Sequence, residues 1–264
     1  MFWQGAQLCW RLESWKCVHN REVKGMLQTI KKQFQVMWRD WAWYVLLISV
    51  FWVAGCILGV ILTVNEAEST SYFRIATLMG GMVGGVVGIL TAIMQIRIYF
   101  DLEVAAGCTR ARFFVSFYIV NAVLNVMIVL FLLVLGVAEG EMYTRMFPGL
   151  GEEMDITAWI WRLGIPAAFV MPAVGGLSGV LVMRFGQKAF WVQWAVWMIL
   201  CIGGPRVIDA AEDAPQTVFG VIGRGAFRLF RAVPVNGWIL AGTGLGLVCL
   251  AGTWLILRKQ QVKG

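Results

Sequence analysis

The sequence comprises 264 residues, of which 59% are hydrophobic and only 14% are charged, and its mean hydropathy is +0.74. A soluble domain holds about 25% charged residues, so this composition excludes a soluble globular protein and indicates an all-α polytopic membrane protein. The formal net charge is +7. Because the basic residues cluster beside apolar runs, the preference of cytoplasmic segments for Lys and Arg explains this charge better than nucleic-acid binding does.

Residues 1–41 are rich in basic and aromatic side chains and precede the first apolar run. Met26, Ile30, Phe34 and Met37 recur at helical spacing, and Lys and Gln residues occupy the rest of that helical wheel. This pattern predicts an N-terminal amphipathic helix that lies on the anionic cytoplasmic leaflet. The alternative is a generic basic anchor with no further role.

Six apolar runs follow and predict six transmembrane helices, at about residues 42–64, 73–96, 113–138, 157–183, 189–203 and 238–257. The expected organisation is therefore a cytoplasmic segment (1–41), a six-helix transmembrane domain (42–257) and a cytoplasmic tail (258–264). With both termini in the cytoplasm, most of the 22 Lys and Arg residues fall on the inner side.

The segment between the fifth and sixth runs, residues 204–236, is an exception to this distribution of Lys and Arg, because it is basic although it is placed on the outer side. Its apolar part is too short to span a membrane, and it carries Arg206, Arg224, Arg228 and Arg231. We expect a helical segment that is either re-entrant or external, and the sequence does not decide between the two.

Two of the predicted spans contain unusual residues. Gly80, Gly84 and Gly88 repeat every four residues in the second span, a spacing that lets helix backbones approach closely in lipid. We predict a helix-packing face, with a gating hinge as the alternative. Asn121 and Asn125 share one face of the third span. Their amides are expected to bond to neighbouring helices or to line a translocation path.

Catalytic and metal-binding patterns are missing from the sequence. The six cysteines form no CxxC motif, and the single histidine, His19, has no acidic or thiol partners nearby. No phosphate-binding loop, HExxH or GxSxG motif occurs. The predicted spans also hold almost no ionisable residues, which argues against an ion-coupled carrier. We therefore expect a protein that is not an enzyme and binds no metal or cofactor itself.

The stretch between the second and third spans, residues 97–112, reads RIYFDLEVAAGCTRAR. Its charges keep it out of hydrocarbon, yet Phe100, Val104 and Cys108 recur at helical spacing. Gly107 follows where a C-terminal helix glycine is expected. The pattern predicts a short amphipathic helix at the membrane surface, and a solvated loop is the alternative.

Residues 106–114, with the sequence AGCTRARFF, resemble the first cytoplasmic loop of type-2 ATP-binding-cassette (ABC) exporter permeases from Gram-positive bacteria. In that family a small-Gly-small-Thr/Ser-Arg-x-basic-Phe-Phe run leads out of a coupling helix into the third span. The resemblance in span number and spacing extends over about residues 25–258.

The resemblance implies a permease subunit of the bacterial cytoplasmic membrane that exports an amphipathic substrate. Antimicrobial peptides, drugs and lipids are the substrates expected from the family, with resistance to antimicrobial peptides as one role. A separate ABC ATPase, which binds ATP and Mg²⁺, would grip the coupling helix. The other expected partners are a second permease copy or paralogue and membrane lipids. The residues implied in ATPase coupling are Phe100, Asp101, Leu102, Glu103, Val104, Gly107, Arg110 and Arg112.

A different class of function remains open from the residues alone. A non-transporting membrane assembly factor or sensor would need no chemistry that the sequence lacks. Such a protein would tolerate charge reversal between the second and third spans.

Overall fold

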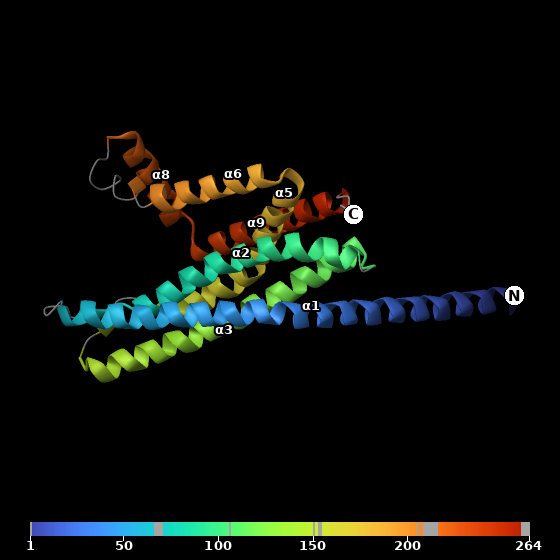
Figure 1. The fold of residues 1–264 in the computed structure, drawn as a ribbon, viewed down its shortest axis with the longest axis horizontal. Coiled ribbons are helices and arrows are strands. Elements are labelled where there is room, and N and C mark those ends of the chain that lie inside the picture. The colour runs from blue at the N-terminus through green and yellow to red at the C-terminus, as the bar shows by residue number, and fades with distance from the viewer. Residues whose placement is uncertain are drawn as a thin grey trace.

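A computed structural model describes residues 2–65, 71–105, 107–149, 151–152, 155–204, 206–207 and 216–259. These residues are almost entirely helical (Figure 1). The long helices are α1 (Phe2–Asn65), α2 (Ile75–Ala105), α3 (Arg110–Met146), α5 (Ile165–Phe185), α6 (Gln187–Met198), α8 (Val218–Ala232) and α9 (Val235–Lys259). The short elements are α4 (Ile156–Trp159), the π-helical turns η1 (Ile160–Gly164) and η2 (Ile199–Gly203), and strands β1 (Ser71–Tyr72) and β2 (Gly151–Glu152).

Five helical stretches in the described residues are long and apolar enough to cross a membrane: Asp40–Asn65, Ile75–Ala105, Arg110–Met146, Ile156–Phe185 and Val235–Lys259. Five of the six predicted spans therefore correspond to helical stretches of sufficient length and hydropathy. The predicted fifth span, residues 189–203, forms the 12-residue α6 and the five-residue turn η2. That pair is helical but is not among the five, because the run is short.

Helix α1 differs from the expected interfacial helix followed by a separate span. It is one continuous helix of 64 residues, and its N-terminal part extends past the other helices (Figure 1). The apolar stripe predicted to lie on lipid instead faces protein. Met37 and Trp41 are buried, and Ile30 and Phe34 pack against the same core. Periodicity shows that one face of a helix is apolar, but it does not show what covers that face.

Helix α2 likewise continues through the segment predicted as a separate coupling helix. It ends at Ala105, and Gly107 follows with φ +88°. The Gly107 N–H donates to the Val104 carbonyl at 3.0 Å, and the Cys108 N–H donates to that of Glu103 at 2.9 Å. Such bonds close a helix at a left-handed glycine. Thr109 then caps α3 by accepting from the Arg112 N–H at 3.3 Å.

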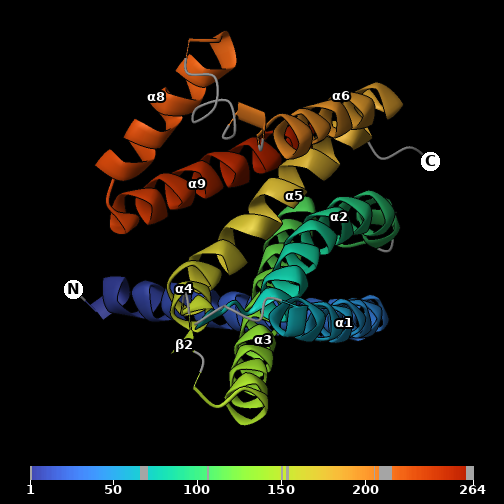
Figure 2. The ribbon, with the colours of Figure 1, turned by 90° about the vertical axis from the view of Figure 1, so that its left-hand side faces the viewer.

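Glycines set the packing distances around α2. A Cβ on Gly80 or Gly84 would lie in contact with Ile48 of α1 and Leu132 of α3. On another side of α2, Gly175 and Gly179 of α5 approach its backbone closely (Figure 2). In lipid the hydrophobic effect does not drive helices together. Small residues at such crossings let the backbones approach closely, and the resulting van der Waals packing holds the helices together.

The contacts also fix the direction of each helix. Gly175 of α5 lies against Ala92 of α2 and Gly179 lies against Ile96, while Gly246 of α9 lies against Val170 of α5. Gly252 of α9 lies against Leu177, so α2, α5 and α9 run in the same direction. The chain between α5 and α9, which includes α6, η2 and α8, therefore returns from one end of the bundle to the other.

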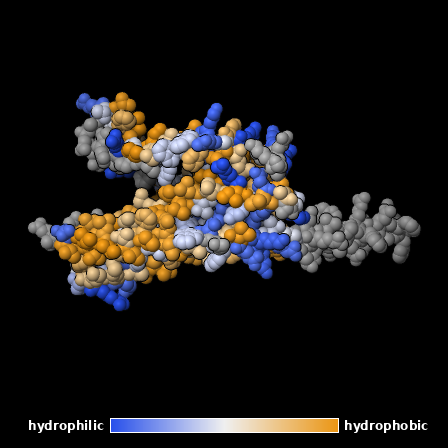
Figure 3. All heavy atoms as spheres, viewed as in Figure 1, coloured by the Kyte–Doolittle hydropathy of each residue, from blue (hydrophilic) through white to orange (hydrophobic). Residues whose placement is uncertain are grey.

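We call the end that holds the turn between α2 and α3 the junction end. The Arg110 guanidinium donates to the Arg258 carbonyl at 2.8 Å, which places the last turn of α9 there. Gln33 donates to Glu103 at 2.8 Å, which places the first half of α1 there too. In Figure 1 the junction end lies toward the right, with both chain ends, and α8 lies toward the left. Figure 3 shows hydrophobic side chains covering the left-hand part of the bundle and hydrophilic ones gathering nearer the junction end.

Candidate functional site

The last turns of α2 are joined to α3 by stacked aromatic rings. Phe100 and Phe113 are fully buried, and their ring centroids lie 5.3 Å apart in an edge-to-face arrangement. Phe117 continues the stack at 5.9 Å from Phe113. Buried aromatic pairs of this geometry resist separation. Phe100, predicted as a coupling residue, therefore faces the interior and not a partner protein.

A second connection joins the same turns to α1. Gln33 Nε2 donates to the Glu103 carboxylate at 2.8 Å, and the Tyr99 hydroxyl donates to Asp40 at 3.1 Å. Both bonds link α1 to the final two turns of α2. Any displacement of these turns would consequently move α1 as well as α3.

The opposite side of the same turns is exposed. Leu102 is 62% exposed, and Ile98 and Ala105 lie one turn before it and one turn after it on the same face. We call these three residues the apolar ridge. The apolar ridge lies just before the hydrophilic turn between two spans, where either lipid or another protein can cover it.

The predicted coupling arginines make contacts within the chain. Arg110 donates to the Arg258 carbonyl, and the Arg112 guanidinium lies 3.4 Å from the point where a Cβ on Gly25 would lie. Arg110 therefore ties α3 to α9, and Arg112 packs against α1. Asp101 and Val104, the remaining coupling candidates on α2, are partly buried, while Gly107 is exposed.

Cys108 offers a chemical probe of this turn. Burial raises the pKa of the Cys108 thiol, and the nearby Glu103 carboxylate raises it further. Since the thiolate is the reactive form, we expect slow alkylation by a maleimide near neutral pH and faster alkylation as the pH rises. Glu103→Gln removes the second cause, so it should speed alkylation at neutral pH. Peptide mapping of the labelled cysteines measures these rates. A wild-type rate equal to that of free cysteine would contradict the buried setting.

Asn121 and Asn125 lie in the packed interface between helices. Both are buried, and their side-chain amides donate to carbonyls one turn earlier in α3, those of Phe117 and Asn121, at 3.0 and 2.9 Å. Asn125 Oδ1 faces Gly88, and the Tyr44 hydroxyl donates to the Gly84 carbonyl beside it. In this single chain the two amides thus pack against the glycine face of α2.

Two apolar grooves, which the sequence did not reveal, lie along α9. One of about 310 Å³ runs between α3 and α9, and one of about 340 Å³ lies between α5 and α9. Tyr118 lines both, and its hydroxyl donates to the Phe169 carbonyl at 2.9 Å. Each groove forms where helices that are remote in sequence meet, so no local sequence signal could have found it.

A buried carboxylate at the other end of the bundle was also missed. Glu139, which directly follows the predicted third span, lies in α3 and is fully buried. It accepts from the Ala76 N–H at 3.0 Å, the Thr77 N–H at 2.7 Å and the Thr77 hydroxyl at 2.5 Å. It therefore caps the N-terminus of α2 from a neighbouring helix, where the helix dipole favours a negative charge.

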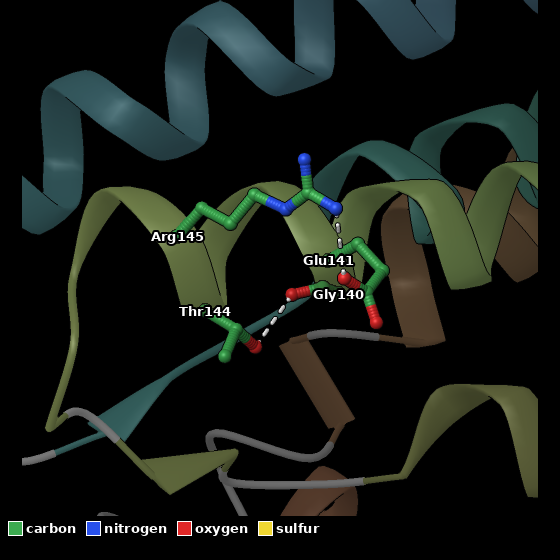
Figure 4. Close-up of polar contacts among 4 residues, drawn as sticks. All are labelled: Gly140, Glu141, Thr144 and Arg145. Atoms are coloured by element: carbon green, nitrogen blue, oxygen red, sulfur yellow. Dashed lines mark hydrogen bonds and ion pairs between the residues drawn. The ribbon is translucent and has the colours of Figure 1, made fainter.

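Close by, a polar recess of about 360 Å³ is lined by Tyr72, Arg74, Val137, Gly140, Glu141, Thr144, Asp155 and Thr157. Of the lining residues, Glu141 pairs with Arg145 at 3.6 Å, and the Thr144 hydroxyl donates to the Gly140 carbonyl at 2.9 Å (Figure 4). Arg74 donates to Thr157 and to the Gly136 carbonyl.

Comparison of the chain with protein-family models, with curated proteins and with solved structures gave no match.

Proposed function

We propose that this chain is the transmembrane permease subunit of an ABC exporter, driven by a separate ATPase subunit. The observation that carries the proposal is the two-sided character of the last turns of α2. One side is bound to α1 through Glu103 and to α3 through Phe100, and the other side presents the apolar ridge. A partner that covers the ridge would gain a rigid connection to three helices.

The proposed coupling follows from these contacts. When the partner closes on ATP and Mg²⁺, it pushes on Leu102 and displaces the end of α2. The Phe100–Phe113 pair transmits this to α3, and the Gln33–Glu103 bond transmits it to α1. The close approach of Gly175 and Gly179 transmits it to α5. Packed interfaces of this kind shift between discrete arrangements, as alternating access requires.

The directions of the helices support six crossings. Since α5 and α9 run the same way, the chain between Phe185 and Val235 crosses back. We assign this crossing to α6 and η2, whose exposed Trp191 and Trp194 would face lipid or a second permease subunit. Both termini then lie on the side of the junction end, which we place in the cytoplasm of a bacterium. An amphipathic substrate such as a peptide, drug or lipid suits the apolar grooves along α9.

One observation favours the alternative of an assembly factor or sensor. Helix α1 runs without interruption from Phe2 through the bundle, and its first half forms a projecting stalk (Figure 1). The amphipathic pattern of this segment predicted a separate interfacial helix there instead. A continuous stalk can bind or report on a second protein without any transport.

The test is copurification of the tagged chain with a nucleotide-binding subunit. Leu102→Asp should abolish copurification and any ATP-dependent export, because it places a charge on the apolar ridge without disturbing the core. The matched control is Lys259→Glu, a charge reversal on an exposed residue in the last turn of α9, which should leave both unchanged. Thermal unfolding of both variants checks that they remain folded.

The alternative makes the opposite prediction. If no nucleotide-binding protein accompanies the chain, or if Leu102→Asp leaves the bound ATPase in place, the ridge is not a coupling surface. A non-nucleotide-binding partner lost on truncation of the stalk would favour an assembly or sensing role.

A further inference from the structure

Helix α8 is amphipathic, and its apolar side is uncovered. Thr217 caps it by accepting from the Gly220 N–H at 3.1 Å. Val218, Phe219, Ile222 and Leu229 fall on one side of the helical wheel and are 54–73% exposed. In water such a surface would be unfavourable, so another phase or another molecule covers it.

The opposite side of α8 is cationic. Arg228 and Arg231 are exposed and lie one turn apart on that side, with Arg224 one turn before Arg228. The helix contains no acidic residue. Gly220 and Gly223 are buried on a third side of the helix. Its apolar and cationic faces both point outward.

The position of α8 relative to the membrane follows from the chain. It ends at Ala232, and the candidate span α9 begins at Val235 after a connection of only Val233 and Pro234. It therefore lies level with the end at which α9 enters the membrane, away from the junction end (Figure 1). Fifteen residues of helix reach roughly 22 Å, too short to cross a hydrocarbon core of about 30 Å. Three arginines also make burial in hydrocarbon unfavourable.

We propose that α8 lies in the plane of the membrane interface, with Ile222 and its apolar neighbours among the acyl chains. Arg228 and Arg231 bind the phosphates of anionic lipid headgroups. At the height of the membrane interface, a helix face that no protein covers is in contact with lipid. The positive charge of the helix complements an anionic leaflet. Lys and Arg are normally scarce on the side of the membrane opposite the cytoplasm. Binding to lipid phosphates explains why arginines nevertheless gather at the end of the bundle that holds α8. The proposal does not depend on the chain being an ABC permease.

The first arm of the test locates the apolar face. Ile222→Cys is placed in a full-length chain whose six native cysteines are replaced, labelled with an environment-sensitive fluorophore, and reconstituted into phosphatidylcholine vesicles with or without phosphatidylglycerol. We expect blue-shifted emission that lipids brominated near the headgroup end of their chains quench. Gln216→Cys, in the exposed turn before α8, should remain in a polar environment.

The second arm tests the arginines. Lipid that copurifies with the wild type should be enriched in phosphatidylglycerol over phosphatidylcholine. The Arg228→Gln/Arg231→Gln double variant should lower this enrichment on the order of tenfold, since each basic residue contributes to the attraction. Arg145→Gln, at the exposed end of α3, is the matched control and should keep it.

Three results would overturn the proposal. Water-like emission at position 222 would place α8 away from the membrane. Blue-shifted emission without quenching by brominated lipid would show that protein, such as a second copy of the chain, covers the apolar face. Unchanged lipid enrichment in the double variant would show that the arginines do not bind the headgroups.

Discussion

Replacing Gly179 with leucine is expected to lower the thermal unfolding midpoint of the detergent-solubilised protein by roughly 5–10 °C. A Cβ at this position would lie 2.5 Å from Ile96 Cγ2 and 3.0 Å from the Ile93 carbonyl oxygen of α2. The β-branched Ile96 has few rotamers with which to move away, and the backbone oxygen has none. The two helices must therefore separate, at a cost of about 1–3 kcal/mol.

The matched control is Gly81→Leu, on α2 itself. A Cβ there would meet no atom within 4 Å, so the added side chain enters open space. Its midpoint should not fall and can rise by a few degrees, because leucine favours the helix over glycine by about 1 kcal/mol. Equal losses in the two variants would mean that the close approach of α5 to α2 does not determine stability.

Glu139→Ala is expected to have the second large effect. The substitution removes an acceptor from the Ala76 and Thr77 N–H groups at the buried start of α2, and from the Thr77 hydroxyl. A buried donor left without its acceptor costs about 1–3 kcal/mol, and in sum we expect a loss of roughly 2–4 kcal/mol because such effects are not additive. Hydrogen exchange should rise first at residues 75–78, where the helix would fray.

Glu141→Ala is the control for that experiment. Glu141 lies two residues further along α3, is exposed, and pairs only loosely with Arg145 at 3.6 Å (Figure 4). Exposed pairs of this spacing contribute about 0.3–0.5 kcal/mol, so the midpoint and the exchange at the start of α2 should barely change. Similar destabilisation by both substitutions would show that any loss of negative charge at this end of the bundle has this effect. The hydrogen bonds from Glu139 to the start of α2 would then not be its cause.

The positions of the long helices follow from the sequence because apolar runs in a membrane protein have a physical length requirement. The span predicted at residues 157–183 corresponds to the observed helical stretch Ile156–Phe185. The span predicted at 238–257 corresponds to Val235–Lys259. The charged ends of α2 and α3 extend further than predicted, to Ala105 and Met146. Hydropathy locates the part of a helix in hydrocarbon, but the helix itself continues until a residue such as Gly107 ends it.

Other features depended on contacts that are remote in sequence. Glu139 follows an apolar run and resembles a loop acid, because its partners Ala76 and Thr77 lie more than sixty residues earlier. The stripe of Met37 and its neighbours predicts an amphipathic helix equally well on lipid or on protein. Among the coupling candidates, the sequence grouped Phe100 with Leu102, although the structure buries the first and exposes the second.

The proposed function requires that an ATPase subunit binds the apolar ridge. Its most direct test is a photo-crosslinking amino acid in place of Leu102 in the membrane of the native cell, followed by identification of the crosslinked protein. We expect a crosslink to a nucleotide-binding subunit, weakened or shifted when vanadate traps ADP on that subunit, and none from the same label at the buried Phe113. A label at Leu102 that crosslinks only to lipid, or to a protein that binds no nucleotide, would contradict the claim.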